Sequence, residues 1–185
     1  MKIKETPIPG LLIIEPDLFE DSRGYFFESY NKRELSNAGI DADFVQDNQS
    51  MSAQGVIRGL HYQLAPYSQA KLVRVLEGSV WDVVVDLRKG SPTYGHAYSL
   101  EISQSNRIQL FIPKGLAHGF AVTSPVAVFS YKCDEYYHPD AERGIHCLDP
   151  VLKIDWPVGI DQAIISHKDR MLPLFADAET NFLYR

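Results

Sequence analysis

A run of eighteen residues, "KLVRVLEGSVWDVVVDLR" (71–88), constrains the fold more than any other stretch of the chain. It is rich in valine and interrupted by "EGS", a pattern typical of two strands joined by a tight turn into a hairpin. Because side chains alternate along a strand, Lys71, Val73 and Val75 share one face of the first arm. The second arm has an apolar face, made of Trp81, Val83, Val85 and Leu87. Its opposite face is charged and is made of Asp82, Asp86 and Arg88.

Turn signals continue this rhythm of short strands along the chain, at "KGSPTYG", "SQSN", "PKG" and "TSP". They favour an all-β sandwich or barrel. One helix is expected in "NKRELSNAGI", with Asn31 as N-cap, Glu34 in a capping box and Gly39 as the stop. A second short helical piece is expected in "DQAIISHKDRM". A chain of 185 residues without repeats or linkers is expected to form a single domain, 1–185.

Composition excludes several classes of protein. The net charge of -6 offers nothing to nucleic acid, although a local cluster of Arg and Lys could still hold an anionic ligand. No secretory leader and no membrane-length apolar stretch are found, so we expect a cytoplasmic protein without a membrane partner. Cys133 and Cys147 have no metal or disulfide spacing and are expected to be reduced.

The stretch "RGLHYQ" (58–63) raises the question of chemistry. A single histidine in a strand-rich chain is usually structural, but His61 has Arg58, Lys71 and His118 as candidate neighbours. Regular alternation puts His61 and Gln63 on one face of the strand and Arg58 on the other. Arg58 and His61 therefore share a site only if the strand is bulged or ends there.

Part of the metal-binding pattern of cupin barrels is also present. Gly55-x5-His61 and the segment "IPKGLAHGF", which contains His118, fit the two halves of this pattern. Gln63, however, stands at the second histidine, and Tyr67 or Ser68 stands at the carboxylate. Two imidazoles with an amide and no carboxylate make a poor divalent site. We therefore expect a cupin-like barrel with no metal and no cofactor.

Eight segments in order resemble one known family, the dTDP-4-dehydrorhamnose 3,5-epimerases, which are metal-free cupins. They are "DSRGYFFESYN", "FVQDNQSMS", "GVIRGLHYQ", "KLVRVLEGSVWDVVVDLRKGSPTYG", "IPKGLAHGF", "YKCDEYYHPDAERGI", "IDWP" and "SHKDR". The resemblance implies an isomerase of the double-stranded β-helix or jelly-roll type with a few short peripheral helices. It further implies a homodimer that inverts C3 and C5 of dTDP-4-dehydro-6-deoxy-D-glucose in dTDP-L-rhamnose biosynthesis, a pathway of cell-surface polysaccharides.

The resemblance assigns four catalytic residues. His61 is the base, and Asp169 is the carboxylate that orients its ring. Lys71 lies near O4, where negative charge develops, and Tyr131 is the proton donor on the opposite face of the sugar. Without the resemblance, Asp169 would be an ordinary helix-end carboxylate and Tyr131 one of ten tyrosines.

The resemblance also assigns substrate contacts, with Tyr137 stacking on thymine and the arginines suited to phosphate. The set comprises Arg23, Glu28, Gln46, Asp47, Asn48, Arg58, His118, Tyr137, Glu142 and Lys168. Because sites in this family borrow residues from the neighbouring subunit, Arg23 and Glu28 are candidates to act across a dimer interface.

Three other functions share parts of this pattern. Enzymes that invert only C3 or only C5 would keep His61, Asp169 and Tyr131, and the placement of Tyr131 relative to C5 would distinguish them. A metal-dependent cupin oxygenase is disfavoured by Gln63 and the missing carboxylate. A non-catalytic nucleotide-sugar binder is disfavoured because the base, its partner, the donor and the cation are all present.

Overall fold

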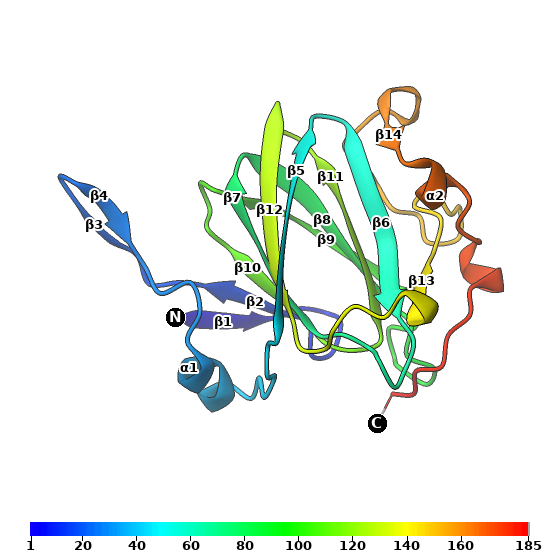
Figure 1. The fold of residues 1–185 in the computed structure, drawn as a ribbon, viewed down its shortest axis with the longest axis horizontal. Coiled ribbons are helices and arrows are strands. Elements are labelled where there is room, and N and C mark those ends of the chain that lie inside the picture. The colour runs from blue at the N-terminus through cyan, green and yellow to red at the C-terminus, as the bar shows by residue number, and fades with distance from the viewer. Residues whose placement is uncertain (185) are drawn as a thin grey trace.

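Two antiparallel sheets face each other in the computed structural model, which describes residues 1–184 except the side chain of Ile160 (Figure 1). In spatial order, the first sheet contains β1 (Lys2–Glu5), β2 (Leu12–Glu15), β10 (Gln109–Ile112), β7 (Lys71–Glu77), β12 (Val126–Cys133) and β5 (Gln46–Ala53). The second contains β13 (Glu142–Gly144), β6 (Val56–Gln63), β11 (Leu116–Val122), β8 (Ser79–Asp86) and β9 (Ala97–Ser103), and β14 (Ile164–Ile165) pairs with β6 in parallel. This is the expected all-β jelly roll of the cupin type.

The stretch 71–88 forms both expected strands, but the expected hairpin is wrong. β7 pairs with β10 and β12 in the first sheet, whereas β8 pairs with β9 and β11 in the second. The chain crosses between the sheets at Gly78, whose φ is 75°. A Cβ there would lie 2.0 Å from the carbonyl oxygen of Val126, so only glycine fits this corner.

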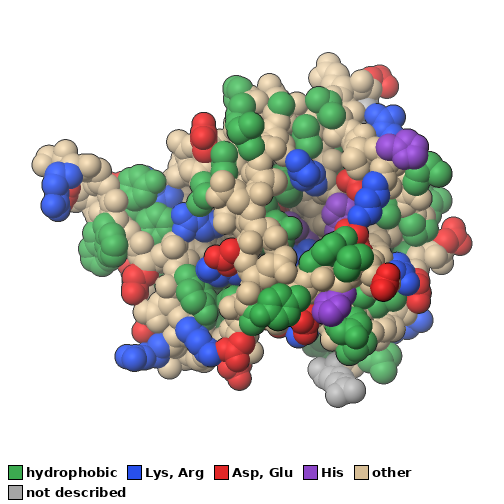
Figure 2. Space-filling view, in the orientation of Figure 1, with side chains coloured by type: hydrophobic (Ala, Val, Ile, Leu, Met, Phe, Trp, Pro, Cys, Tyr) green, Lys and Arg blue, Asp and Glu red, His purple; other side chains and the backbone are tan. Residues whose placement is uncertain are grey.

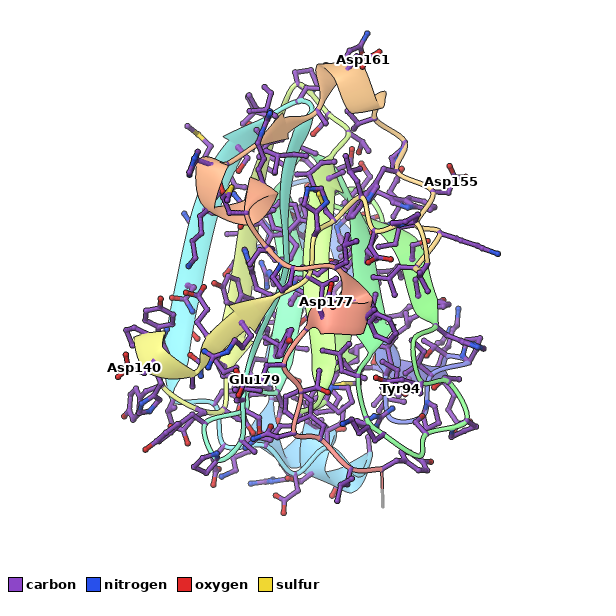
Figure 3. The ribbon with its side chains drawn as sticks, turned by 90° about the vertical axis from the view of Figure 1, so that its right-hand side faces the viewer. Tyr94, Asp140, Asp155, Asp161, Asp177 and Glu179 are labelled. Carbon is purple, nitrogen blue, oxygen red and sulfur yellow. The ribbon has the colours of Figure 1, made fainter. Side chains whose placement is uncertain are left out.

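Both faces of β8 are buried, and this explains the misleading pattern. Val80 and Val84 point between the sheets, where they pack with Val73 and Val75. The face with Trp81, Val83 and Val85 lies on the outer side of the second sheet, where it packs against residues including Ile145, Leu152 and Phe182. Figure 3 shows the chain around Asp177 and Glu179 crossing this side of the molecule. The charged face of β8 is therefore directed into the interior, where Asp82 and Asp86 are fully buried.

The helices are peripheral and short, as expected. α1 (Lys32–Asn37) is capped by the Asn31 side chain, which accepts hydrogen bonds from the backbone N–H groups of Arg33 and Glu34. Gly39, at φ 84°, ends it. α2 (His167–Arg170) lies in the second predicted helical piece and is capped by Ser166. Three 3₁₀ turns, η1 (Pro139–Ala141), η2 (Ile160–Gln162) and η3 (Phe175–Asp177), complete the described helices.

A two-stranded hairpin, β3 (Phe19–Asp21) and β4 (Gly24–Phe26), projects away from the barrel (Figure 1). Its aromatic residues are exposed, with Phe19, Tyr25 and Phe26 each showing more than half of their surface. Among residues 1–184, no helix has the length and apolar character needed to span a membrane.

Candidate functional site

A β-bulge in β6 brings Arg58 and His61 to the same cavity, the condition that the sequence left open. Across the β6–β11 ladder, Arg58 is opposite Phe120 and His61 is opposite His118, so two residues of β6 face one residue of β11. Gly59 and Gly119 allow this close approach. A Cβ on Gly59 would lie 2.7 Å from the Gly119 Cα, and one on Gly119 would lie 2.6 Å from the Arg58 carbonyl oxygen.

The cavity has a volume of about 260 Å³ and lies between the two sheets. Figure 2 shows it as a hollow with histidine and basic side chains inside. Phe120 and Phe129 form a stacked pair in its lining, with ring centroids 4.3 Å apart. The sequence-predicted residues that line it are Asn48, Arg58, His61, Lys71, His118 and Tyr131. Six residues from five different strands therefore converge on one polar, partly aromatic pocket.

Asp169 contacts His61 although 108 residues separate them in the sequence. The Nε2 of His61 lies 2.7 Å from the Oδ1 of Asp169, and the Gly59 N–H donates to Oδ2 at 3.4 Å. α2 places Asp169 there, because Ser166 caps this helix and accepts a hydrogen bond from the Asp169 N–H. The side chains of these two residues are therefore in direct contact.

Asp169 keeps its charge although its side chain is only 6% exposed. Burial acts to raise the pKa of this carboxyl, but the hydrogen bond and charge of His61, with smaller contributions from Gly59 and Ser166, lower the pKa below its usual value. An ionised Asp169 can only accept a hydrogen bond, so the proton of the neutral ring sits on Nε2. Nδ1 is then the ring nitrogen with the basic lone pair.

A second imidazole–carboxylate pair lies beside the first. The Nε2 of His118 is 2.9 Å from the Oδ2 of Asp82, and both residues are buried. The Oδ1 of Asp82 has no hydrogen-bond partner among residues 1–184. Burial raises the pKa of the Asp82 carboxyl, despite the opposing effect of His118 and Lys71. Sequence reasoning missed Asp82, and its only signal was an acid on the polar face of β8.

Lys71 and Tyr131 enter the cavity from the first sheet, opposite the two histidines. The Lys71 Nζ lies 5.8 Å from the centroid of the Tyr131 ring. Burial lowers the pKa of the Lys71 ammonium and raises the pKa of the Tyr131 phenol. The pocket therefore presents two imidazoles on one sheet and the amino group of Lys71 with the phenol of Tyr131 on the other.

Arg58 and Asn48 are held by side chains of β5. The Arg58 Nε donates to the Ser52 hydroxyl at 3.0 Å, which leaves the other guanidinium nitrogens available for an anion. Asn48 accepts a hydrogen bond from the Gln46 amide at 3.1 Å. Ser52, which sequence reasoning did not single out, is a buried hydroxyl with no signal in its local pattern.

Tyr137, Glu142 and Lys168 form a hydrogen-bonded chain beside the cavity. The Tyr137 hydroxyl donates to Glu142 Oε2 at 2.8 Å, and the Lys168 ammonium pairs with the same oxygen. Burial acts to raise the pKa of Glu142, but the hydrogen bonds and charge of Lys168 and Tyr137 lower it below its usual value. These bonds raise the pKa values of both Tyr137 and Lys168. Three predicted binding residues are thus linked to one another.

Three predicted binding residues neither line this cavity nor join the hydrogen-bonded groups beside it. Arg23 is on the projecting hairpin, where it pairs with Asp21. Glu28 follows that hairpin and accepts a hydrogen bond from Asn31. Asp47 is on the opposite face of β5 from Asn48, where it forms an ion pair with Lys132. Strand alternation explains the position of Asp47, because adjacent residues point to opposite sides of a sheet.

The two histidines and the glutamine at the positions of the cupin metal pattern have hydrogen-bond partners within the protein. The Nε2 atoms of His61 and His118 contact carboxylates, and the Gln63 amide binds backbone groups of Tyr67, Tyr136 and His138. Within the described residues, no group of three or more His, Cys, Asp and Glu side chains is arranged to hold a metal.

Comparisons with known proteins identify the family of the chain. Residues 5–177 match the family model described as dTDP-4-dehydrorhamnose 3,5-epimerase. A protein of that name from Pseudomonas aeruginosa is 50% identical over 180 residues, covering 97% of this chain and 98% of the relative.

Two crystal structures extend the likeness to the fold. The dTDP-4-dehydrorhamnose 3,5-epimerase of Elizabethkingia anophelis superposes with a TM-score of 0.92 at 49% identity, covering 96% of this chain and 97% of that one. The dTDP-6-deoxy-D-glucose-3,5-epimerase of Legionella pneumophila, solved in complex with dTDP-4-keto-L-rhamnose, gives 0.91 at 50% identity and covers 95% and 93%. The chain, with its pocket of paired histidines, lysine and tyrosine, belongs to the dTDP-4-dehydrorhamnose 3,5-epimerase family.

Proposed function

We propose that this isomerase converts dTDP-4-dehydro-6-deoxy-D-glucose to dTDP-4-dehydro-L-rhamnose by inverting C3 and C5. One observation carries the mechanism. His61 and Tyr131 line the same cavity but come from opposite sheets, β6 and β12. Inversion of a carbon requires removal of a proton on one face and return of a proton on the other, and this arrangement supplies a group for each face.

The ketone at C4 makes the hydrogens on C3 and C5 acidic, because the carbanion left behind is delocalised onto O4. In the proposed step, Nδ1 of His61 takes the proton, and the ionised Asp169 stabilises the imidazolium that forms. The Lys71 ammonium offsets the negative charge on O4, where a fixed cation stabilises the transition state more than the ketone. Tyr131 then donates its phenol proton to the opposite face of the carbon.

His61 and Tyr131 return to their starting protonation states by proton exchange with solvent. The cycle runs once at C3 and once at C5. The imidazolium loses its proton to water, and the tyrosinate takes one back. No electrons are transferred between molecules, so the reaction needs no redox partner. The raised pKa of Tyr131 supports its role as an acid, since the phenol stays protonated at neutral pH.

The other side chains at the cavity are proposed to bind the nucleotide. Arg58 is suited to a phosphate oxygen, and Asn48 and His118 to hydrogen bonds with substrate oxygens. Gln46, Glu142 and Lys168 support Tyr137, for which we propose a stacking contact with thymine. Asp47 has an ion pair on the outer face of β5, so only a rearrangement or a second subunit would bring it to the ligand.

We include a homodimer in the proposal, with Arg23 and Glu28 reaching the site of the neighbouring subunit. Support comes from the projecting hairpin, whose exposed Phe19 and Phe26 belong to none of the hydrophobic clusters of the described residues, while Tyr25 contacts the barrel only through its ring face under the Arg107 guanidinium among the contacts of the described residues. We further propose that residues 1–185 act as a single domain. The cytoplasm is the proposed location, because a charged sugar nucleotide does not cross a membrane unaided.

In the decisive experiment, the protein is incubated with dTDP-4-dehydro-6-deoxyglucose in deuterated water. Doubly inverted product with one deuteron at C3 and one at C5 is expected. For Tyr131→Phe, we expect exchange to persist while doubly inverted product falls by about 10² to 10³, because this variant keeps the base but lacks the acid. Deuterium at only one carbon in the wild-type protein would instead identify a single-centre epimerase.

A further inference from the structure

Gln63 is a buried amide at the end of β6, two residues after His61, and it binds the backbone of two loops. Its Nε2 donates to the carbonyl oxygens of Tyr67 at 2.6 Å and Tyr136 at 3.1 Å. Its Oε1 accepts a hydrogen bond from the His138 N–H at 2.7 Å. Two partners can only accept and one can only donate, so the orientation of the amide is unambiguous.

These bonds bracket Tyr137 on both sides. Gln63 holds the carbonyl of Tyr136 and the N–H of His138, which belong to the peptide groups before and after Tyr137. The N–H of Tyr137 itself donates to the Gln46 Oε1 at 3.0 Å. Both peptide planes that flank Tyr137 are therefore anchored, and together they set its φ and ψ and the direction in which its side chain leaves the backbone.

The rest of the loop is held in the same way, although Tyr137 itself is exposed. The Gln69 amide donates to the carbonyl of Glu135 at 2.8 Å, and the His138 ring stacks on Tyr67 with centroids 3.8 Å apart. Tyr137 is 50% exposed, and its hydroxyl contacts Glu142. An exposed aromatic ring on an anchored backbone is preorganised for a flat ligand, because less conformational entropy is lost on binding.

An imidazole at position 63 could not make these contacts. A neutral imidazole has one donor and one acceptor, and a protonated one has only donors, whereas this position requires two donated bonds and one accepted bond. The amide is therefore a functional replacement in this chain for the second histidine of the metal-dependent cupin pattern, rather than a lost ligand.

We propose that Gln63 is a positioning residue that holds Tyr137 in the orientation required to stack on the base of the bound nucleotide. This inference rests on the proposed function, since it takes Tyr137 as the contact with thymine. It assigns Gln63 to nucleotide affinity and not to the proton transfers, although only two residues separate it from the base.

The test measures dTDP binding by calorimetry and turnover of the sugar substrate in Gln63→Met. We expect the Kd of dTDP to rise about tenfold or more, while kcat at saturating substrate stays within about threefold of the wild type. The matched control is Asn181→Leu. Asn181 is also an amide that hydrogen-bonds the backbone, but its bonds go to the N–H and carbonyl of Ala65 and not to residues 136–138. Its loss should change the Kd by less than about threefold.

A double-mutant cycle with Tyr137→Ala separates positioning from general loosening of the protein. If Gln63 acts through Tyr137, adding Gln63→Met to Tyr137→Ala should raise the Kd by less than about twofold. An equal rise in both backgrounds would overturn the proposal, as would unchanged dTDP affinity in Gln63→Met or Tyr137→Ala. Failure of the wild-type protein to epimerise its substrate would be a separate result, because dTDP binding is measured without turnover.

Gln63→Glu is the second variant, in case Gln63→Met yields no folded protein. It retains the length of the side chain and the acceptor for the His138 N–H, and it places a carboxylate oxygen, which cannot donate, opposite the carbonyl oxygens of Tyr67 and Tyr136. The same rise in Kd is expected, and unchanged dTDP affinity in this variant would also refute the proposal.

Discussion

The pairs His61–Asp169 and His118–Asp82 contain the same two residue types, yet their surroundings give them different properties. The histidines are opposite each other on β6 and β11, and each contacts its carboxylate through Nε2 at 2.7 and 2.9 Å. The His61 side chain is 31% exposed, but that of His118 is only 8% exposed.

The carboxylates differ even more than the rings. Asp169 accepts hydrogen bonds that lower its pKa. Asp82 has one oxygen without a hydrogen-bond partner in the described part of the chain, and burial raises its pKa. The hydrogen-bond donors around a carboxylate therefore determine whether it stays ionised and can stabilise a charged imidazole. His61 has both access to the ligand and a stable anion behind it, so it is suited to be the base. His118, which is less exposed, is suited to making a hydrogen bond in a fixed orientation.

Replacing each histidine with alanine should give the largest difference between the two pairs in the rate of deuterium uptake by the substrate. For His61→Ala, we expect a loss of at least about 10³ in the rate of deuterium uptake at C3, because the base is removed. For His118→Ala, exchange should remain measurable, with a weaker apparent affinity for the substrate. NMR of the substrate in deuterated water measures both. Undiminished exchange in His61→Ala would exclude it as the base.

Replacing the carboxylates tests their charges with little change of shape. Asp169→Asn should lower kcat about 10²-fold, because the imidazolium loses its counter-charge and the ring loses its preferred tautomer. Asp82→Asn should lower kcat by less than about tenfold, since the charge of Asp82 is already disfavoured by burial. Steady-state kinetics compares them directly, and equal losses would show that the two pairs share one role.

Alkaline pH tests Lys71 and Tyr131, the two groups that the first sheet contributes to the cavity. The lowered pKa of Lys71 means that its cation is lost below the ordinary lysine value of 10.5, whereas Tyr131 keeps its proton above 10.0. We therefore expect kcat to fall first with the titration of Lys71. Lys71→Arg should move this alkaline decline upward, because guanidinium does not titrate there. A pH profile of kcat for both proteins checks this, and identical profiles would contradict it.

The contributions of Asp169 and Asp82 to the free energy of unfolding should change with pH in opposite directions. The folded pKa of Asp169 is lowered, so its ionisation adds stability above the unfolded value near 3.8, and this contribution is lost as pH falls through the folded pKa. The folded pKa of Asp82 is raised, so any stability it provides is present below the unfolded value and lost as pH rises through the folded pKa.

The opposite directions of the two pKa shifts predict how Asp169→Asn and Asp82→Asn change the free energy of unfolding. At pH 7, Asp169→Asn should lower the free energy of unfolding by roughly 1 to 3 kcal/mol, and Asp82→Asn should lower it less. The difference between wild type and Asp169→Asn should shrink in acid. Urea denaturation at several pH values measures both, and a larger loss in Asp82→Asn at pH 7 would contradict the assignment.

Chelation should have the smallest effect, because the Nε2 atoms of both histidines contact carboxylates and Gln63 stands where the cupin metal pattern has its second histidine. Turnover is expected to be unchanged after treatment with EDTA. Loss of activity that a divalent ion restores would show that the pairs are metal ligands.

Much of the fold was predictable from local patterns. The valine-rich stretch 71–88 gave its two strands, and Asn31, Glu34 and Gly39 predicted α1. The pairing of β7 with β8 was not predictable, because a glycine turn looks the same whether it closes a hairpin or crosses between sheets. The strand pairings show which turn this chain forms, since β7 and β8 belong to different sheets.

The sequence by itself determined the residue types of the site and, through ordered motifs, the family. The tertiary structure alone decided which of these residues meet. The bulge at Gly59 turns Arg58 and His61 to one side, Asp169 reaches His61 across 108 residues, and Asp82 turns inward to His118. The physical reason is that strand alternation and capping are local, whereas sheet pairing, bulges and burial depend on contacts between segments that are distant along the chain.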